Sequence, residues 1–496
     1  MFKRLPNFSV LLAGLLTAQA IASVQVFLSN REVYNSIAAI AQSGYLNMPN
    51  ETLLEMLKSW RPALGGGLFF TLSIGAGLTL LSLAFIWTWK TLCARSKAVL
   101  VLLIVLWLAI LVGINRHGLI FMPSLYFLLI PGIVYYIYGR SRHAKPVHGT
   151  ALPTICHLAC IAVLGLIWST QAHSNMFITI RDNLLLGNPV GISINNFYYA
   201  YTHYSAETIG SLRQKMFKTY HFSNTKGSHE STRLENVLSD YVYLQVAADS
   251  RGDIQIIQAD NQLIFLSRGG KTLFETPVKE FLNKPEKILK EVSQKTDKNF
   301  FFRRTIFFSL LIAFPITLYW LLHALFNLGI SFFFSQKRAS LISTFICFMV
   351  GIAIIIPVNW GGDREIDRDQ LAAMLAGKNW RDNVAGLKTI TKNNLEITAI
   401  ATYGHLMESP HIPVRYWLAR ALGKSRQQKT YQDLLRMLHA SHPNVICQAL
   451  YSIGHRGNTG AIQNILDIID GSDHWYVQRY AYNALRNLGW KHQRSI

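Results

Sequence analysis

The sequence predicts a mainly α protein: a polytopic α-helical membrane protein of about seven spans, with a small α/β extramembrane domain and a C-terminal α-solenoid. Three observations predict this fold class. Only 15% of the 496 residues are charged, against about 25% in an average soluble protein. Two long tracts, between Glu55 and Asp182 and between Asp297 and Asp363, contain no Asp or Glu. The C-terminal part repeats itself with a spacing of 31 or 32 residues.

Apolar runs of about 20 residues are long enough to cross a bilayer. The sixth run is overlong and contains Pro315, so we expect it to be tilted, kinked or partly interfacial. The first run also resembles a secretory signal, but its apolar character continues to Leu28, so we expect an uncleaved anchor. The predicted spans are 8–28, 64–88, 98–114, 119–138, 151–170, 305–333 and 339–358.

Basic residues in short loops indicate the orientation, because Lys and Arg resist translocation. The loop 30–63 mixes acids and bases and is expected outside the cytoplasm. Counting from a cytoplasmic N-terminus, residues 171–304 and the tail from 359 also emerge on the extracytoplasmic side. We therefore expect an integral protein of a bacterial inner (plasma) membrane, with the lipid bilayer as one partner. The basic, acid-free loops that indicate this orientation are 1–7, 89–97, 139–150 and 335–338.

Charge and titratable groups exclude two classes of function. The net charge of +21 is spread along the chain, whereas a nucleic-acid-binding protein concentrates Lys and Arg on one soluble face; no nucleic-acid partner is expected. Ion-coupled transporters bury ionisable residues in their spans, but the predicted spans contain no Asp or Glu, and only His157 and His323 titrate well inside them. Coupled transport is therefore disfavoured.

The cysteines predict no metal site and no cofactor. Cys156 and Cys160 lie one helical turn apart in "CHLAC", beside His157. A second Cys pair, which would complete a zinc site, does not occur in the sequence. We interpret the motif as small residues at a helix contact.

The domains expected from these patterns are 1–170, a membrane domain with five spans; 171–304, an extracytoplasmic α/β domain; 305–358, two further spans; and 359–496, the repeat domain.

Alternating residues in the middle domain predict an antiparallel meander of three strands, at 241–247, 253–258 and 262–267. Thr276 and Pro277 are the expected cap and first residue of a following helix, which Pro285 would break.

Three segments of the tail align as repeats. "VRYWLARALG" from 414 matches "VICQALYSIG" from 445 and "VQRYAYNALR" from 477. Similar apolar residues recur at offsets 0, 4, 7 and 8, which lie on one face of a helix. A preceding helix recurs too, so each unit is a helical hairpin, and weaker copies start near 366.

This pattern resembles the HEAT repeat, in particular the short HEAT-like units of phycobilisome lyases, over about residues 366–490. The spacing is shorter than the ~40 residues of typical HEAT units, and the third copy has Arg486 where the others have Gly423 and Gly454. The resemblance implies an α-solenoid that binds through its second helices, and it does not imply lyase chemistry.

Offsets 2 and 6 of the second helices point away from the repeat core, so we expect them in solvent or against a partner. Tyr and Arg are favoured at protein contacts, and the predicted partner-binding residues are Tyr416, Arg420, Tyr451 and Arg479. Cys447 shares the expected exposed face.

Three histidines, His411, His442 and His474, each precede an aligned valine by three residues. Stacked helices lie about 8–10 Å apart, too far for one shared ion, so turn positions that recur with the repeat explain them better than a metal site.

The function expected from the sequence is that of a membrane-anchored scaffold or assembly factor, which binds a protein partner through the extracytoplasmic repeats. The alternative is a membrane-associated enzyme or a transport-complex subunit with a site at the outer membrane–water boundary. Candidate groups for the alternative are Glu32, Glu51, Glu55 or the carboxylates of the middle domain, but no spacing favours any of them. We therefore expect no catalytic residue.

Overall fold

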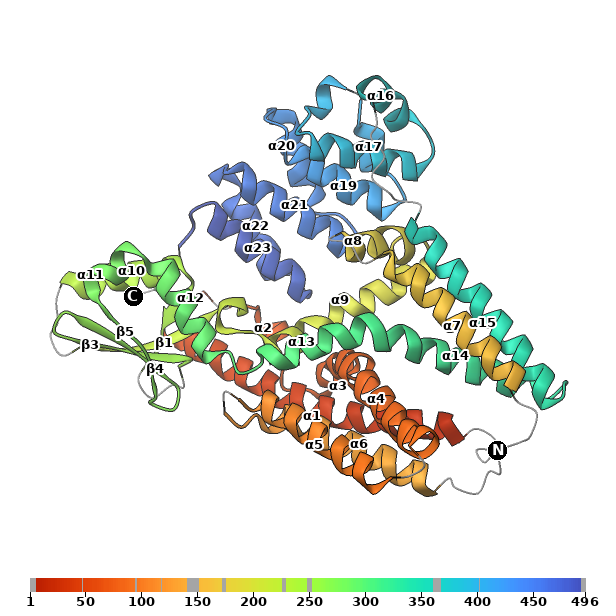
Figure 1. Ribbon diagram of the computed structural model, residues 1–496. Coiled ribbons are helices and arrows are strands. Elements are labelled where there is room, and N and C mark those ends of the chain that lie inside the picture. The colour runs from red at the N-terminus through yellow and green to blue at the C-terminus, as the bar shows by residue number, and fades with distance from the viewer. Residues whose placement is uncertain are drawn as a thin grey trace. The chain divides into compact units, whose positions relative to one another are not determined.

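The computed structural model describes residues 6–46, 48–93, 96–116, 118–140, 151–171, 175–224, 229–247, 252–359, 367–400 and 402–491. Half of the basic loop residues that predict the orientation (Lys3, Arg4, Arg95, Arg142 and Lys145) lie outside these ranges. The chain is mainly helical, with one small sheet (Figure 1). It forms two compact units: the first unit comprises 1–43, 56–165 and 204–351, and the second unit comprises 44–55, 166–203 and 352–496.

Six helical segments of the described chain are long and apolar enough to cross a membrane. They are Phe8–Gln42, Trp60–Lys90, Lys97–Ile114, Phe121–Gly139, Phe300–Ile330 and Gln336–Pro357. The remaining predicted span, the fifth (151–170), corresponds to α7 (Ala151–Ser169), whose apolar part, Ile155–Ser169, is shorter than the other six segments. The helices that make up the six segments are α1 (Pro6–Gln42), α3 (Trp60–Phe70), η2 (Thr71–Gly75), α4 (Ala76–Trp87), η3 (Thr88–Leu92), α5 (Lys97–Ile114), α6 (Phe121–Arg140), α13 (Phe300–Phe308), η6 (Ser309–Ala313), α14 (Phe314–Ile330) and α15 (Gln336–Asn359).

Pro315 interrupts the overlong apolar segment, as the sequence predicts. Proline has no backbone N–H to donate to the preceding turn, and here the helix widens into the π-helical turn η6 just before the proline. π-helical turns are rare, and they accommodate such breaks in an otherwise continuous helix.

Small and polar residues join the apolar helices. α1 packs against α3 and α6. A Cβ placed on Gly75 would lie 2.4 Å from the Cβ of Ala18 in α1, so only glycine permits this approach. The Tyr126 hydroxyl donates a buried hydrogen bond of 2.9 Å to the Gln25 side chain.

The first unit also contains a five-stranded sheet with the order β2-β1-β3-β4-β5. β3, β4 and β5 form an antiparallel meander, whereas β1 is parallel to both β2 and β3. Apolar residues such as Tyr220, Ile256 and Phe265 fill the core. The elements are η5 (Leu212–Gln214), β1 (Lys218–Asn224), α10 (His229–Asp240), β2 (Tyr243–Gln245), β3 (Ile254–Ala259), β4 (Gln262–Ser267), β5 (Thr272–Pro277), α11 (Val278–Asn283) and α12 (Pro285–Thr296).

The sheet corrects two predictions. The meander does not begin at 241–247, because β1 lies between β2 and β3. Thr276 and Pro277 end strand β5, and the helix begins one residue later, at Val278. The predicted break at Pro285 is confirmed, since α12 begins there with proline in its first turn.

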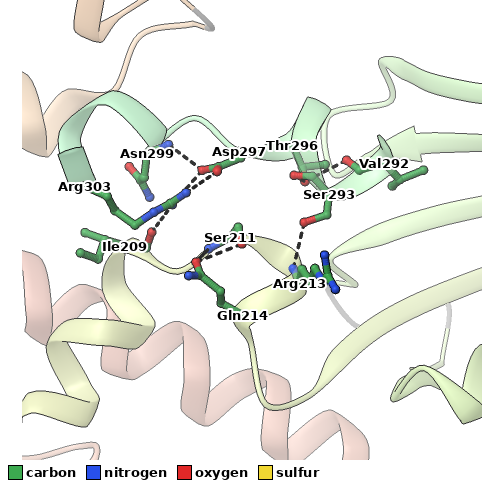
Figure 2. A network of polar contacts seen from close by, with 10 residues as sticks. All are labelled: Ile209, Ser211, Arg213, Gln214, Val292, Ser293, Thr296, Asp297, Asn299 and Arg303. Carbon is green, nitrogen blue, oxygen red and sulfur yellow. Dashed lines mark hydrogen bonds and ion pairs between the residues drawn. The ribbon is translucent and has the colours of Figure 1, made fainter. Parts of the chain in front are cut away.

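A polar network fixes the end of α12 to α13 and η5 (Figure 2). The Arg303 guanidinium binds both carboxylate oxygens of Asp297 and donates a bond of 2.7 Å to the Ile209 carbonyl. The Arg213 N–H donates to the Ser293 hydroxyl over 2.9 Å. Bidentate Arg–carboxylate pairs hold a defined geometry, so this network keeps the sheet domain in a fixed position against α13.

The second unit consists of helical pairs together with two shorter pieces of chain. In each pair the two helices pack together, and the second helices α17, α19, α21 and α23 pack on one another in chain order. The repeat helices are α16 (Arg368–Ala376), α17 (Trp380–Lys392), η7 (Ile397–Ala399), α18 (Gly404–Met407), α19 (Ile412–Leu422), α20 (Gln428–Met437), α21 (Pro443–Arg456), η8 (Thr459–Ala461), α22 (Ile462–Gly471) and α23 (Trp475–Asn487). The shorter pieces contain α2 (Glu51–Met56), α8 (Met176–Ile180), η4 (Arg181–Leu185) and α9 (Pro189–Ile209), which belongs to this unit up to His203.

Candidate protein-binding surface

The aligned positions of the repeats form the core of the second unit. Every residue at offsets 0, 4, 7 and 8 is at most 3% exposed, which confirms the alignment. These residues are Val414, Leu418, Ala421, Leu422, Val445, Ala449, Ser452, Ile453, Val477, Ala481, Ala484 and Leu485.

Glycine lies at the end of α19 (Gly423) and in the last turn of α21 (Gly454) because the next second helix lies close to it. A Cβ on Gly423 would lie 2.5 Å from the Ser452 hydroxyl, and a Cβ on Gly454 would lie 2.8 Å from the Ala484 α-carbon. Arg486 takes the equivalent place in α23, after which no further helix follows in the described part of the chain. Arg486 can therefore replace glycine in α23, because no following helix packs against this position in the described part of the chain.

The chain's own residues 176–203 lie against the second helices of the repeats. Asp182 is fully buried there, and it accepts a bond of 2.7 Å from the indole N–H of Trp417 in α19. Arg181 donates to the other carboxylate oxygen through Nε and Nη2 (2.9 and 2.7 Å). Lys388 Nζ of α17 lies 3.6 Å from Asp182. The carboxylate thus joins η4 to two repeats.

α9 continues this contact along the repeats. The Asn195 amide donates to the Asn444 side chain of α21 over 3.3 Å. His203 stacks on Trp475 of α23, with ring centroids 4.0 Å apart. Burial, then the charges of Arg479 and His474, lowers the pKa of His203 well below its usual value, so this imidazole is neutral at pH 7.

The loop before α2 makes a third contact with the repeats. The Asn50 side-chain amide donates to the carbonyls of Ile469, Asp470 and Ser472 (2.9–3.2 Å), which end α22. The Asn50 N–H donates to the Gln478 side chain of α23 over 3.0 Å. Asn50 therefore satisfies carbonyls that a helix end leaves without intrahelical partners.

The structure divides the four predicted partner-binding residues into two pairs. Tyr416 is half-buried beneath Arg181, whose guanidinium carbon lies 3.9 Å from the ring centroid. Arg479 is half-buried and acts electrostatically on His203. Arg420 lies 5.0 Å over the Trp417 ring, and Tyr451 is 43% exposed. Tyr416 and Arg479 thus face the covering segment 176–203. Arg420 and Tyr451 lie outside the contact with that segment.

The prediction that Cys447 faces solvent is wrong. Its side chain is 8% exposed, and burial raises the pKa of its thiol. Burial is also the main cause of the raised pKa of Tyr199 in α9, to which the nearby Cys447 contributes. Around Asn444 and Cys447, the face of α21 that points away from the repeat core is therefore covered by α9 and not by water.

An open stripe remains along the last turns of the second helices, at offsets 6 and 10. Tyr451 and His455 pack together in it, with ring centroids 4.0 Å apart and the ring planes tilted by 32°. Arg420 and Lys424 give it positive charge, and no acidic residue occupies these offsets. We define the open stripe as Arg420, Lys424, Tyr451, His455, Asn483 and Asn487, of which all but the half-buried Arg420 are exposed.

The other candidate groups do not assemble a reactive centre. Glu32 is exposed and lies 3.6 Å from Arg268, and Glu51 and Glu55 lie on the exposed side of α2. Within the first unit, His157 and His323 lie together, with ring centroids 4.5 Å apart, a pairing that their separation in the sequence does not reveal. Among the described residues, no group of three or more His, Cys, Asp or Glu could hold a metal ion.

Comparison with known proteins identifies the repeats. Residues 401–486 match the family model of HEAT repeats. The C-terminal part of the chain therefore carries HEAT-like repeats, a class of helical hairpin repeat that generally mediates protein interactions. No curated protein and no solved structure matches the chain.

Proposed function

We propose that this chain is a membrane-anchored scaffold that binds a protein partner through the open stripe of its HEAT-like repeats. The observation that carries the proposal is the combination of matched repeats with an uncovered row of Arg, Lys, Tyr and His at their ends. Arg and Tyr are the residue types enriched at the centres of protein interfaces. The positive charge of the stripe favours a partner that presents acidic side chains.

Membrane anchoring accounts for the apolar surface of the first unit. α5 is apolar around its whole circumference: Leu102, Val105 and Val112 are 53–71% exposed. A soluble helix buries one apolar face, whereas a helix that is apolar all round lies in a protein core or in lipid. Since these side chains are not covered by protein, we take hydrocarbon as their solvent.

Contacts within the second unit support seven crossings. Asn50 and Asp182 both bind the repeats, so the three pieces of chain must lie on one side of the membrane. Among the described residues, four apolar helices separate Asn50 from Asp182 when α7 is counted, and two separate α9 from α16. An even number of crossings returns the chain to the side of the membrane from which it started, so four and then two crossings keep the three pieces on one side. Without a crossing by α7, Asn50 and Asp182 would lie on opposite sides.

The charges of the short loops indicate on which side of the membrane the N-terminus lies. A basic N-terminus and the basic loops near 89–97 and 335–338 favour a cytoplasmic N-terminus. After one, five and seven crossings, all three pieces of the second unit are then extracytoplasmic. The scaffold would therefore serve a partner in or at the outer side of a bacterial inner membrane.

Co-purification tests the partner. The full chain is purified in mild detergent alongside a variant with Arg420→Ala, Tyr451→Ala and His455→Ala. We expect a stoichiometric protein to accompany the wild type and to be lost from the variant. Melting should change little, since substitutions at the exposed Tyr451 and His455 each cost under about 0.5 kcal/mol. The half-buried Arg420 adds about 0.5–1 kcal/mol through its contact with the Trp417 ring. A control with Lys429→Ala and Gln432→Ala, exposed on α20, should retain the partner.

Two outcomes would contradict this proposal. A partner retained equally by the stripe variant would exclude the stripe as the binding surface. A small molecule or lipid as the sole companion of the wild type would favour an enzyme or a transport-complex subunit.

Thiol labelling tests the topology separately. Cys447 is unsuitable because it is buried, so Lys429→Cys supplies a reporter on the exposed face of α20. A membrane-impermeant maleimide, applied to cells with a permeabilised outer barrier, should label Lys429→Cys and spare Cys93 until the inner membrane is broken. Labelling of Cys93 alone before lysis would invert the topology.

A further inference from the structure

Buried polar atoms without partners gather beneath α9, at the beginnings of α21 and α23. His442 is 7% exposed and Asn195 is fully buried. The atoms that lack a hydrogen-bond partner are His442 Nε2, Arg415 Nε, His474 Nδ1 and Asn195 Oδ1. Buried polar groups are nearly always satisfied, so each exception needs an explanation, such as a bound ligand or water.

The capping bond of α21 determines which of these atoms are donors. His442 is the N-cap, and its Nδ1 accepts from the Asn444 N–H over 3.3 Å. A neutral imidazole that accepts at Nδ1 carries its proton on Nε2. Nε2–H of His442 is thus a buried donor without an acceptor. Arg415 Nε–H is a second one, because a guanidinium never accepts.

These groups form one cluster. Burial first, and then the charges of Arg415 and His474, lowers the pKa of His442 to about 4; both residues therefore lie near the imidazole. No carboxylate of the described chain forms an ion pair with Arg415. The nearest acid in sequence is Asp473, beside His474, and its side chain is exposed. Asp473 acts electrostatically on His474, and the positive charge that no carboxylate pairs with is that of Arg415.

Two helix N-termini add to that charge. α21 and α23 have 14 and 13 residues and begin directly after His442 and His474. The N-terminus of a helix carries roughly half a positive charge. Pro443 has no N–H, and the Asn444 N–H is already bound by His442, so α21 supplies electrostatic potential and the side chains supply the donors.

We propose that Arg415, His442 and the beginnings of α21 and α23 bind a phosphate-type oxyanion. Its oxygens accept from His442 Nε2–H and Arg415 Nε–H, and Asn195 Oδ1 accepts from a protonated oxygen of the same ligand or from a bound water. The oxyanion is either free phosphate or the headgroup of an anionic phospholipid; in phosphatidylcholine the choline ammonium neutralises the phosphate. This site is independent of the open stripe, so each proposal can fail without the other.

Calorimetric titration of the delipidated full chain in neutral detergent with inorganic phosphate tests the site, with chloride at the same ionic strength as reference. We expect saturable binding that is about 10- to 100-fold weaker in Arg415→Ala, since hydrogen bonds to charged groups contribute about 1.5–3 kcal/mol. His442→Ser keeps a good N-cap but loses the Nε2–H donor, so it should also weaken binding. Lys429→Ala removes an equal charge from α20 and should bind like the wild type.

Nanodiscs distinguish the two sources of phosphate. If the ligand is a headgroup, the wild type should be stabilised in phosphatidylglycerol discs relative to phosphatidylcholine discs, the gain should vanish in Arg415→Ala, and added inorganic phosphate should have no further effect in phosphatidylglycerol. If Arg415→Ala does not fold, Arg415→Gln, which keeps most of the side chain, carries the same expectation. Absence of both responses in the wild type, or equal responses in Arg415→Ala, would overturn the proposal and leave water as the occupant.

Discussion

Asp182→Asn should release residues 176–203 from the repeats. The carboxylate is fully buried, accepts from Arg181 and Trp417, and lies 3.6 Å from Lys388. Asparagine has almost the same shape, but it turns one acceptor into a donor and leaves two cations uncompensated. Removal of one partner from a buried ion pair costs about 3–5 kcal/mol. Because Lys388 is 23% exposed and can rehydrate, we expect about 3 kcal/mol.

Hydrogen exchange followed by mass spectrometry measures this local opening. A loss of about 3 kcal/mol corresponds to about 150-fold faster exchange in the protected amides of α8, η4 and α9. Asp467→Asn, which changes an exposed carboxylate of α22, is the control and should leave those amides unchanged. Equal protection in Asp182→Asn and Asp467→Asn would refute the view that the buried carboxylate holds this segment on the repeats.

Three further predictions concern stability, each measured by thermal unfolding. Gly454→Ala places a Cβ 2.8 Å from the backbone of α23 and should cost about 1–3 kcal/mol, whereas Gly471→Ala meets nothing within 4 Å and should be neutral. Since the pKa of His442 falls from 6.5 to about 4 on folding, the unfolded chain binds an extra proton between these values, so stability should decrease as pH falls from about 6.5 to about 4, less steeply in His442→Ser. Arg303→Met breaks the network of Figure 2 and should cost about 1–3 kcal/mol, while Arg304→Met, at an exposed neighbour, should cost little.

The features that the sequence predicted correctly are periodic or uniform along the chain. Burial at offsets 0, 4, 7 and 8 follows from local helix geometry, so three aligned segments were enough to locate the repeat core. The uniformly apolar runs located the long helices in the same way. Burial alternates along the whole of β3 and along most of β4, and both strands lie within or one residue beyond their predicted ranges.

The features that were missed depend on contacts between distant residues. β1, "KTYHFSN", is largely polar, and it pairs in parallel with strands on both sides; parallel pairing has no short turn that would mark it in the sequence. Cys447 was placed in solvent because the repeat pattern describes only the repeat's own core. Nothing in that pattern indicates that residues 176–203 cover the opposite face.

One signal for this contact was available in the sequence. The stretch "NNFYYAYTHY" of α9 is rich in Asn, Tyr and His, which combine apolar area with groups that need hydrogen-bond partners. Such a composition suits burial against another polar and aromatic surface, and the second helices supply one in Trp417, Asn444 and Trp475. Composition alone, however, does not distinguish that surface from a membrane interface.

The size of the open stripe predicts how a partner must bind. Offsets 6 to 10 cover about 6–9 Å along each helix, and three helices spaced about 8–10 Å apart give a width of about 25–30 Å. The stripe therefore offers roughly 250 Å², against ~800 Å² per partner in a stable complex. A tight partner must contact more than the stripe, so its hydrogen-exchange footprint should extend from α19, α21 and α23 onto neighbouring surface. A footprint confined to those three helices, together with nanomolar affinity, would contradict this estimate.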